Sequence, residues 1–154
     1  MARGSGQHEG EPLLGFTFRL EVAGSVSVVG FFTECSGLAS ENDVVEHKVV
    51  TQDGHEIVQM IPGRLKWGPV TLKRGVTTDV SFWDWRALVE QGNMADARAA
   101  VSLVMLDRDY KDVARWELER AWPSKISGPT FKADGNELGI EEVTIVHEGM
   151  KRTK

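Results

Sequence analysis

The side chains that most often carry catalysis are few in this sequence, and they do not form a set. Cys35 is the single cysteine, so neither an internal disulfide nor a cluster of thiolate zinc ligands is available. It follows an apolar segment with no base beside it, which is typical of a small buried side chain. His47 and His55 flank a predicted turn, and their imidazoles are expected to face each other across it. Two ligands do not make a zinc site, so the pattern favours a solvated cross-strand pair.

The acidic residues form two patterns that resemble sites but lack a necessary part. Residues 107–112 (DRDYKD) mimic the start of a calcium loop, yet the required glycine is missing and Leu118 stands where the final glutamate belongs. A polar hairpin turn is the favoured interpretation. Glu141 and Glu142 are neighbours in a predicted strand, so they point to opposite faces unless a bulge rotates one of them. With no phosphate-binding glycine loop either, the sequence predicts no enzyme, no metal and no cofactor.

The five tryptophans are the remaining candidates for a binding site. Trp85 falls on the apolar face of a predicted helix, and Trp116 and Trp122 fall on the apolar face of a strand, so we expect all three in the core. Trp67 lies in a turn-rich stretch and Trp83 lies off the main helical face. These two are the better candidates for a surface or an interface.

Composition excludes several classes of protein. The chain has 154 residues, the size of one domain, and a formal net charge of −5, which argues against general nucleic-acid binding. No apolar run approaches the roughly 20 residues of a membrane span. Residues 1–12 are polar and carry no apolar signal core, so we expect the chain to be made and folded in a cytoplasm.

Alternating apolar residues predict the strands that would position these side chains. Residues 16–22 alternate apolar and polar side chains, and residues 26–34 form a second strand that pairs with them as a hairpin. Residues 42–50 and 55–61, joined by a TQDG turn, predict another hairpin with too few apolar residues on one side for a core. The 42–61 segment is therefore expected to project from the body as an arm.

The second half contains the only convincing helix, at residues 79–91. Thr78 or Asp79 is expected to cap it, Phe82 and Trp85 lie on its apolar face, and Gly92 ends it.

Further strands follow the helix. Residues 99–106 are apolar on both faces and predict a central strand, and residues 113–122 alternate until Pro123 is expected to stop them. The last strand, 138–147, changes its apolar phase at Glu141, which predicts a β-bulge.

These elements predict a mainly β domain, a two-sheet β-sandwich or small barrel with one helix closing one end and a projecting hairpin arm. Residues 1–15 are expected to be a flexible lead, 16–150 the domain and 151–154 a tail.

Six segments, taken in order, resemble the tail-tube proteins of contractile phage tails and phage-tail-like contractile injection systems, which are related in fold to the tube protein of type VI secretion. The segments are GFTFRLEVAG (15–24), VVGFFTECSGL (28–38), IPGRLKWGPVTLKRG (61–75), FWDWRALVEQG (82–92), RWELERAWPSKISGP (115–129) and NELGIEEVTIVHEGM (136–150). The arm departs from the family pattern, because it lacks a stretch like Tyr-Arg-Glu-Gly-Gly.

The resemblance implies function by assembly. Such subunits form six-membered rings that stack into a hollow tube inside a contractile sheath, and each subunit's sheet joins that of its neighbour around a lumen. The implied partners are further copies of the chain, sheath subunits, baseplate or spike and tube-terminator proteins, and cargo in the lumen. The particle would be assembled in a bacterial cytoplasm and then released or docked on a membrane.

The arm is the expected strap between subunits or between rings. The residues proposed for assembly contacts are Glu46, His47, Lys48, Asp53, His55, Glu56, Gln59 and Trp67. Three alternatives stay open: the tube-initiating ring of the baseplate, a secreted ring protein like that of type VI secretion, and a stand-alone β-sandwich that binds a ligand through Trp67 or Trp83.

Overall fold

The computed structural model describes residues 16–24, 28–129 and 139–154, so the predicted lead lies outside the described residues. The described part contains ten strands and two helices. The strands are β1 (Thr17–Ala23), β2 (Val28–Phe32), β3 (Glu34–Ser36), β4 (Ser40–Val50), β5 (Glu56–Trp67), β6 (Val70–Gly75), β7 (Ala99–Leu106), β8 (Asp112–Ser127), β9 (Ile140–Val146) and β10 (Gly149–Arg152). The helices are α1 (Ser81–Glu90) and α2 (Met94–Ala97).

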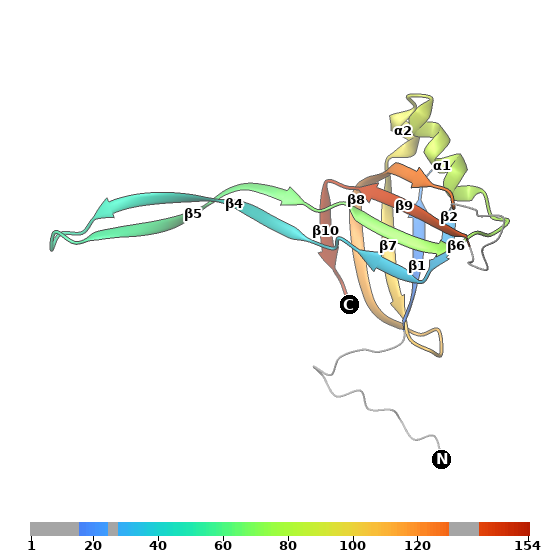
Figure 1. The fold of residues 1–154 in the computed structure, drawn as a ribbon, viewed down its shortest axis with the longest axis horizontal. Coiled ribbons are helices and arrows are strands. Elements are labelled where there is room, and N and C mark those ends of the chain that lie inside the picture. The colour runs from blue at the N-terminus through green and yellow to red at the C-terminus, as the bar shows by residue number, and fades with distance from the viewer. Residues whose placement is uncertain (1–15, 25–27, 130–138) are drawn as a thin grey trace, which may run out of the picture.

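The first sheet has the strand order β2-β1-β7-β8, with β10 on the other side of β8 (Figure 1). β1 and β2 form the predicted hairpin, and β7 is the predicted central strand, between β1 and β8. Strand β10 was not expected: Lys151 and Arg152, assigned to a tail, pair with β8 instead. The backbone N–H of Thr153 extends this pairing to the carbonyl of Arg115.

The second sheet has the order β8-β9-β6-β3, and β8 belongs to both sheets. Its residues 112–121 pair with β7 and residues 122–127 pair with β9. The prediction that Pro123 stops this strand is wrong. The register shifts between Pro123 and Lys125, and such a bulge accommodates a residue that has no N–H to donate. Arg120, just before this point, adopts the left-handed conformation with φ of 47°.

The body is therefore the predicted two-sheet structure rather than a closed barrel. β2 and β3 are separated only by Thr33, whose N–H donates to the carbonyl of Lys73, so this segment passes from one sheet to the other. The core lies between the two sheets and under α1. Its largest fully buried side chains are Trp85, Phe32, Phe82, Leu20, Leu72, Leu103, Leu106, Leu118 and Ile145.

The helices lie together at one end of the body (Figure 1). α1 is shorter than predicted and starts at Ser81, whose backbone N–H donates to the Asp79 carboxylate at 3.0 Å. This hydrogen bond holds the pKa of Asp79 below its usual value. Gly92 ends the segment with φ of +79°, as predicted. Trp85 is buried, as expected, and its indole N–H donates to the carbonyl of Ala97, the last residue of α2, a short helix that was not predicted.

The bulge predicted in the last strand is wrong. β9 pairs with β6 without interruption from Ile140 to Ile145, and Glu141 points into the core with an exposed fraction of 3%. The alternation of inward-facing side chains continues through residue 141, so a carboxylate occupies a position in the core. It does so because Arg74 on β6, itself 5% exposed, places its Nε 2.9 Å from Oε2 of Glu141.

Arg74 and Glu141 connect three parts of the body. The Trp83 indole N–H donates to the other carboxylate oxygen of Glu141, which ties α1 to β9. The Arg74 guanidinium lies over the rings of Phe82 in α1, 4.8 Å from its centroid, and of Phe32 in β2, 5.3 Å from its centroid. Trp83, expected at a surface or an interface, is thus half-exposed and anchored to the body.

Removing Arg74 would leave the Glu141 carboxylate buried without a countercharge, and removing Glu141 would leave the buried Arg74 with only the more exposed Asp79, 3.6 Å from its Nη1. We expect Glu141→Leu to lower the free energy of unfolding by about 3–5 kcal/mol, and the double variant with Arg74→Met to recover most of that loss. Chemical denaturation followed by tryptophan fluorescence measures both. Glu90→Leu, which removes an exposed partner of Arg86 in α1, is the control and should cost less than about 1 kcal/mol. Equal losses in the single and double variants would contradict this account.

Candidate assembly surfaces

The arm is a two-stranded sheet that extends away from the body on the side of β10, opposite β2 (Figure 1). It is longer than the predicted 42–61, since pairing runs from Ser40 with Trp67 to Val50 with Glu56. Eight of the fifteen large apolar side chains exposed in the described part of the chain lie on it: Val44, Val45, Val50, Ile57, Val58, Met60, Ile61 and Leu65. A hairpin with apolar residues along its length and nothing covering them indicates a surface that a partner covers.

The register divides the arm into two faces of different character, because directly opposite residues of an antiparallel pair share a face. One face, here called the uncharged face, carries the pairs Val45–Ile61, His47–Gln59 and Val49–Ile57. The opposite face, here called the charged face, carries the pairs Val44–Pro62, Glu46–Met60, Lys48–Val58 and Val50–Glu56. Between the pairs Val44–Pro62 and Val50–Glu56, only the second face brings charges among its apolar residues, with the Lys48 Nζ 3.9 Å from a carboxylate oxygen of Glu56. Nearer the body, Asp43 and Lys66 form an ion pair at 2.7 Å.

The structure separates His47 from His55, so the expectation that they face each other is wrong. His47 lies opposite Gln59. His55 lies in the turn at the tip, where its backbone N–H donates to the hydroxyl of Thr51. The turn is one residue longer than the TQDG motif suggests, which moves His55 out of the ladder. Within the described residues, no group of three or more side chains is placed to hold a metal ion.

The other predicted assembly residues are distributed along the arm. Asp53 lies in the tip turn, Glu46, Lys48 and Glu56 lie on the charged face, and Gln59 lies on the uncharged face. The prediction selected polar residues and missed the apolar ones between them. Alternation of Val and Ile with polar side chains was the signal that could have identified them.

Trp67 lies at the base of the arm and is half-buried rather than free. Its ring contacts the imidazole of His147, with 5.8 Å between the centroids, and a ring nitrogen of His147 lies 3.1 Å from the carbonyl oxygen of Gly68. Gly37 adopts φ of +88°, and a Cβ there would lie 1.9 Å from the carbonyl oxygen of Pro69. These contacts fix the direction in which the arm leaves the body.

Two strands of the first sheet have unpaired edges in the described structure. β2 pairs only with β1, and β10 pairs only with β8, so the sheet ends in a free strand on each side. On β2, Val29 and Phe31 are each 52% exposed beside this edge. An apolar free edge promotes pairing with another chain.

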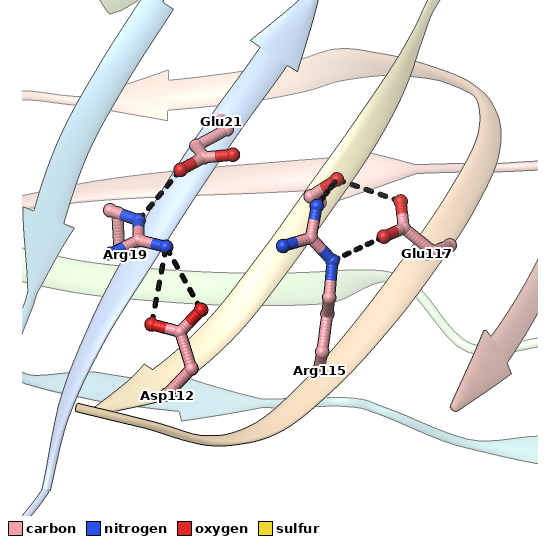
Figure 2. Close-up of polar contacts among 6 residues, drawn as sticks. Arg19, Glu21, Asp112, Arg115 and Glu117 are labelled. Carbon is pink, nitrogen blue, oxygen red and sulfur yellow. Dashed lines mark hydrogen bonds and ion pairs between the residues drawn. The ribbon is translucent and has the colours of Figure 1, made fainter. Parts of the chain in front are cut away.

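The face of the first sheet that the second sheet does not cover carries a row of ion pairs (Figure 2). Arg19 on β1 lies 2.7 Å from Glu21 and 3.3 Å from Asp112 on β8. Arg115 donates to Glu117 at 2.5 Å. Val104, paired with both arginines across the sheet, is fully buried between them, which is consistent with their aliphatic stems covering it.

The Arg115–Glu117 pair is reinforced by Ser102 on β7. The Ser102 hydroxyl donates to Glu117 at 2.7 Å and accepts from Arg115 at 3.1 Å. The hydrogen bond to Glu117 raises the pKa of Arg115. Burial opposes ionisation of Glu117, but its hydrogen bonds from Arg115 and Ser102 outweigh burial and lower its pKa. Both groups are therefore charged and mutually neutralised at neutral pH.

The candidates for catalysis have structural roles. Cys35 packs against the core, and burial raises the pKa of its thiol to about 12, so it is a poor nucleophile. A carboxylate oxygen of Asp107 accepts from the N–H groups of Asp109 and Lys111, which makes 107–112 the predicted hairpin turn. None of the described helices has the length and apolar character that crossing a membrane requires.

Comparison with known proteins identifies the family. A model of the family described as T4-like virus tail tube protein gp19 matches residues 14–151. A comparison with curated proteins finds no match.

Solved structures show the same fold at low sequence identity. A chain of the sheath–tube complex of the extracellular contractile injection system PVC, in its extended state, is 19% identical with a TM-score of 0.73, over 94% of this chain and 93% of that one. A chain of the tube-terminating cap of the anti-feeding prophage is 19% identical with a TM-score of 0.72, over 99% of both. Hcp1 from Flavobacterium johnsoniae is 14% identical with a TM-score of 0.55, over 88% and 94%.

The family resemblance drawn from the sequence is thus confirmed. Since the family model matches 14–151 of 154 residues, this chain belongs to the T4-like virus tail tube protein family, and it is a structural tail tube protein rather than an enzyme.

Proposed function

We propose that this chain is the inner tube subunit of a contractile injection system: six copies form a ring, and stacked rings form a hollow tube that delivers cargo. The observation that carries the proposal is the arm, whose exposed apolar side chains have no cover in a single copy. Each strand of about 11 residues makes the arm about 36 Å long, enough to lie across a neighbouring subunit.

The two free edges supply the contact within a ring. A head-to-tail contact requires two different complementary edges, and a rotation that closes produces a ring. The β10 edge of one copy would pair with the β2 edge of the next, which covers Val29 and Phe31 and satisfies the free backbone groups. The arm leaves the body on the β10 side, so one neighbour would receive both the edge and the arm (Figure 1).

In such a ring the uncovered face of the first sheet would line the lumen. It presents two arginines, Arg19 and Arg115, against three carboxylates, Glu21, Asp112 and Glu117. Charges already paired with one another attract a passing protein weakly, because their fields cancel within a short distance. This lining suits transport of protein cargo without adhesion.

The remaining proposed partners are the sheath around the tube, the baseplate or spike at one end and the terminator at the other. Solved structures of a sheath–tube complex, a terminating cap and a baseplate each contain a chain of this fold. A second candidate is the tube-initiating ring of the baseplate, supported by the likeness to a chain of the anti-feeding prophage baseplate with a TM-score of 0.68. We propose assembly in the bacterial cytoplasm, with no insertion of this chain into a membrane and no sequence-specific binding of nucleic acid.

Removing the arm should separate folding from assembly. We expect a variant in which an Asn-Gly turn replaces residues 43–64, and so joins the paired residues Asn42 and Leu65, to keep the melting temperature of the body within a few degrees. It should sediment as a monomer where the full chain sediments as rings. Analytical ultracentrifugation with circular dichroism makes the comparison, and normal rings or tubes from the shortened chain would contradict the proposed strap.

A matched pair of substitutions tests which face of the arm is covered. Ile57 lies on the uncharged face and Val58 on the charged face, and the two are similarly exposed, at 43% and 49%. Ile57→Asp would bury a carboxylate among apolar groups, so we expect it to raise the protein concentration needed for assembly at least tenfold, or about 1.4 kcal/mol. Val58→Asp should have little effect. Equal effects would show that the uncharged face has no special role.

A further inference from the structure

The two ends of the β7–β8 hairpin carry different features. At one end the turn 107–111 projects beyond the sheet, and at the opposite end lie α2 and the start of β7 (Figure 1). Between α2 and the strands is a hollow of about 710 Å³. The projecting turn and the hollow therefore lie at opposite ends of the same pair of strands.

The turn presents Tyr110 rigidly to solvent. Tyr110 is the only tyrosine of the chain, is 70% exposed and adopts the left-handed conformation with φ of 59°. Asp107 holds the turn: its carbonyl accepts from the N–H of Tyr110, and its carboxylate accepts from the N–H groups of Asp109 and Lys111 at 2.8 and 2.9 Å. A strained backbone that carries an exposed aromatic side chain indicates a contact residue held ready for a partner.

The hollow has the size and chemistry to receive an aromatic ring. The small side chains of Ala95, Ala99 and Ala100 leave the space open, and Met94 forms part of the wall. Glu119 and Arg120 complete the lining, and Arg120 is paired with Glu148 at 2.7 Å. Arg98 lines the hollow and is exposed, and its guanidinium makes no hydrogen bond or ion pair within the described residues. A guanidinium without a partner beside a hollow whose other walls include three alanines and a methionine suits a ring and a carboxylate together.

We infer that Tyr110 of one copy enters the hollow of the next copy along the strand direction. The turn carries as many basic as acidic side chains, so the proposed match is between two single groups: the carboxylate of Asp109 and the guanidinium of Arg98 have opposite charges, and neither has a hydrogen-bond or ion-pair partner among the described residues. The contact joins two different surfaces of the chain. Because no rotation closes the series of copies into a ring, the contact repeats along an axis. This inference rests on the proposed function, because stacked rings bring the two ends together, and it names the contact between rings.

Site-specific cross-linking tests the contact directly. In a Cys35→Ala background, full-length chains carrying Tyr110→Cys and Ala95→Cys are assembled and treated with a short bis-maleimide. We expect a ladder of covalent multimers on denaturing gels. The control pairs Tyr110→Cys with Val76→Cys, an exposed position outside the hollow, and should yield no ladder. Rings or tubes visible by negative-stain microscopy without a ladder would overturn this contact and leave the ring proposal standing, whereas chains that stay monomeric would overturn both.

A charge exchange provides a second readout. Arg98→Asp and Asp109→Arg should each reduce the mass of sedimentable tubes at least tenfold while rings persist, since each places like charges together. The double variant should recover most of the tubes, because the opposite charges then face each other again. Failure of the double variant to recover tubes would contradict the pairing of the turn with the hollow.

Discussion

Arg74 and Glu141 are the two charged side chains that the described core contains, and each supplies the buried countercharge of the other at 2.9 Å. Their pairing fixes β6 against β9, brings the indole of Trp83 onto the carboxylate and stacks the guanidinium on Phe32 and Phe82. Gly30 allows this close approach, because a Cβ there would lie 2.4 Å from the ring of Phe82. Both sheets and α1 thus hold one relative position, and the surfaces of the body are presented in fixed directions.

A rigid body whose surfaces carry uncovered apolar side chains and unpaired backbone groups is suited to be one subunit of an assembly. The arm, the β2 and β10 edges and the hollow beside α2 each expose groups that a single copy does not cover. They point in different directions, so one copy can contact several others at once. Hydrogen bonds between backbone edges require little apolar surface, so an acidic chain of modest apolar content is compatible with the proposed self-assembly.

Local patterns predicted much of this fold. Alternation predicted the β1–β2 hairpin, a run that is apolar on both faces predicted the central β7, and helical spacing predicted α1 with its glycine end. Pairing between distant residues was harder to foresee: the pattern at Glu141 indicates a bulge until Arg74, 67 positions earlier in the chain, is known to lie beside it. The continuation of β8 past Pro123 likewise depends on β9, which shifts register there. For the arm, the projecting hairpin was predictable, but polar residues were selected as its contacts although the alternating valines and isoleucines carried the signal for an apolar surface.

If the arm and the two free sheet edges are the contacts between subunits, isolated copies of the chain assemble without any other component. Negative-stain electron microscopy of the purified full-length chain at increasing concentration tests it most directly. We expect six-fold rings with a central channel that stack into tubes of uniform diameter as the concentration rises. A chain that remains a monodisperse monomer at the highest attainable concentration, with its arm intact, would contradict it.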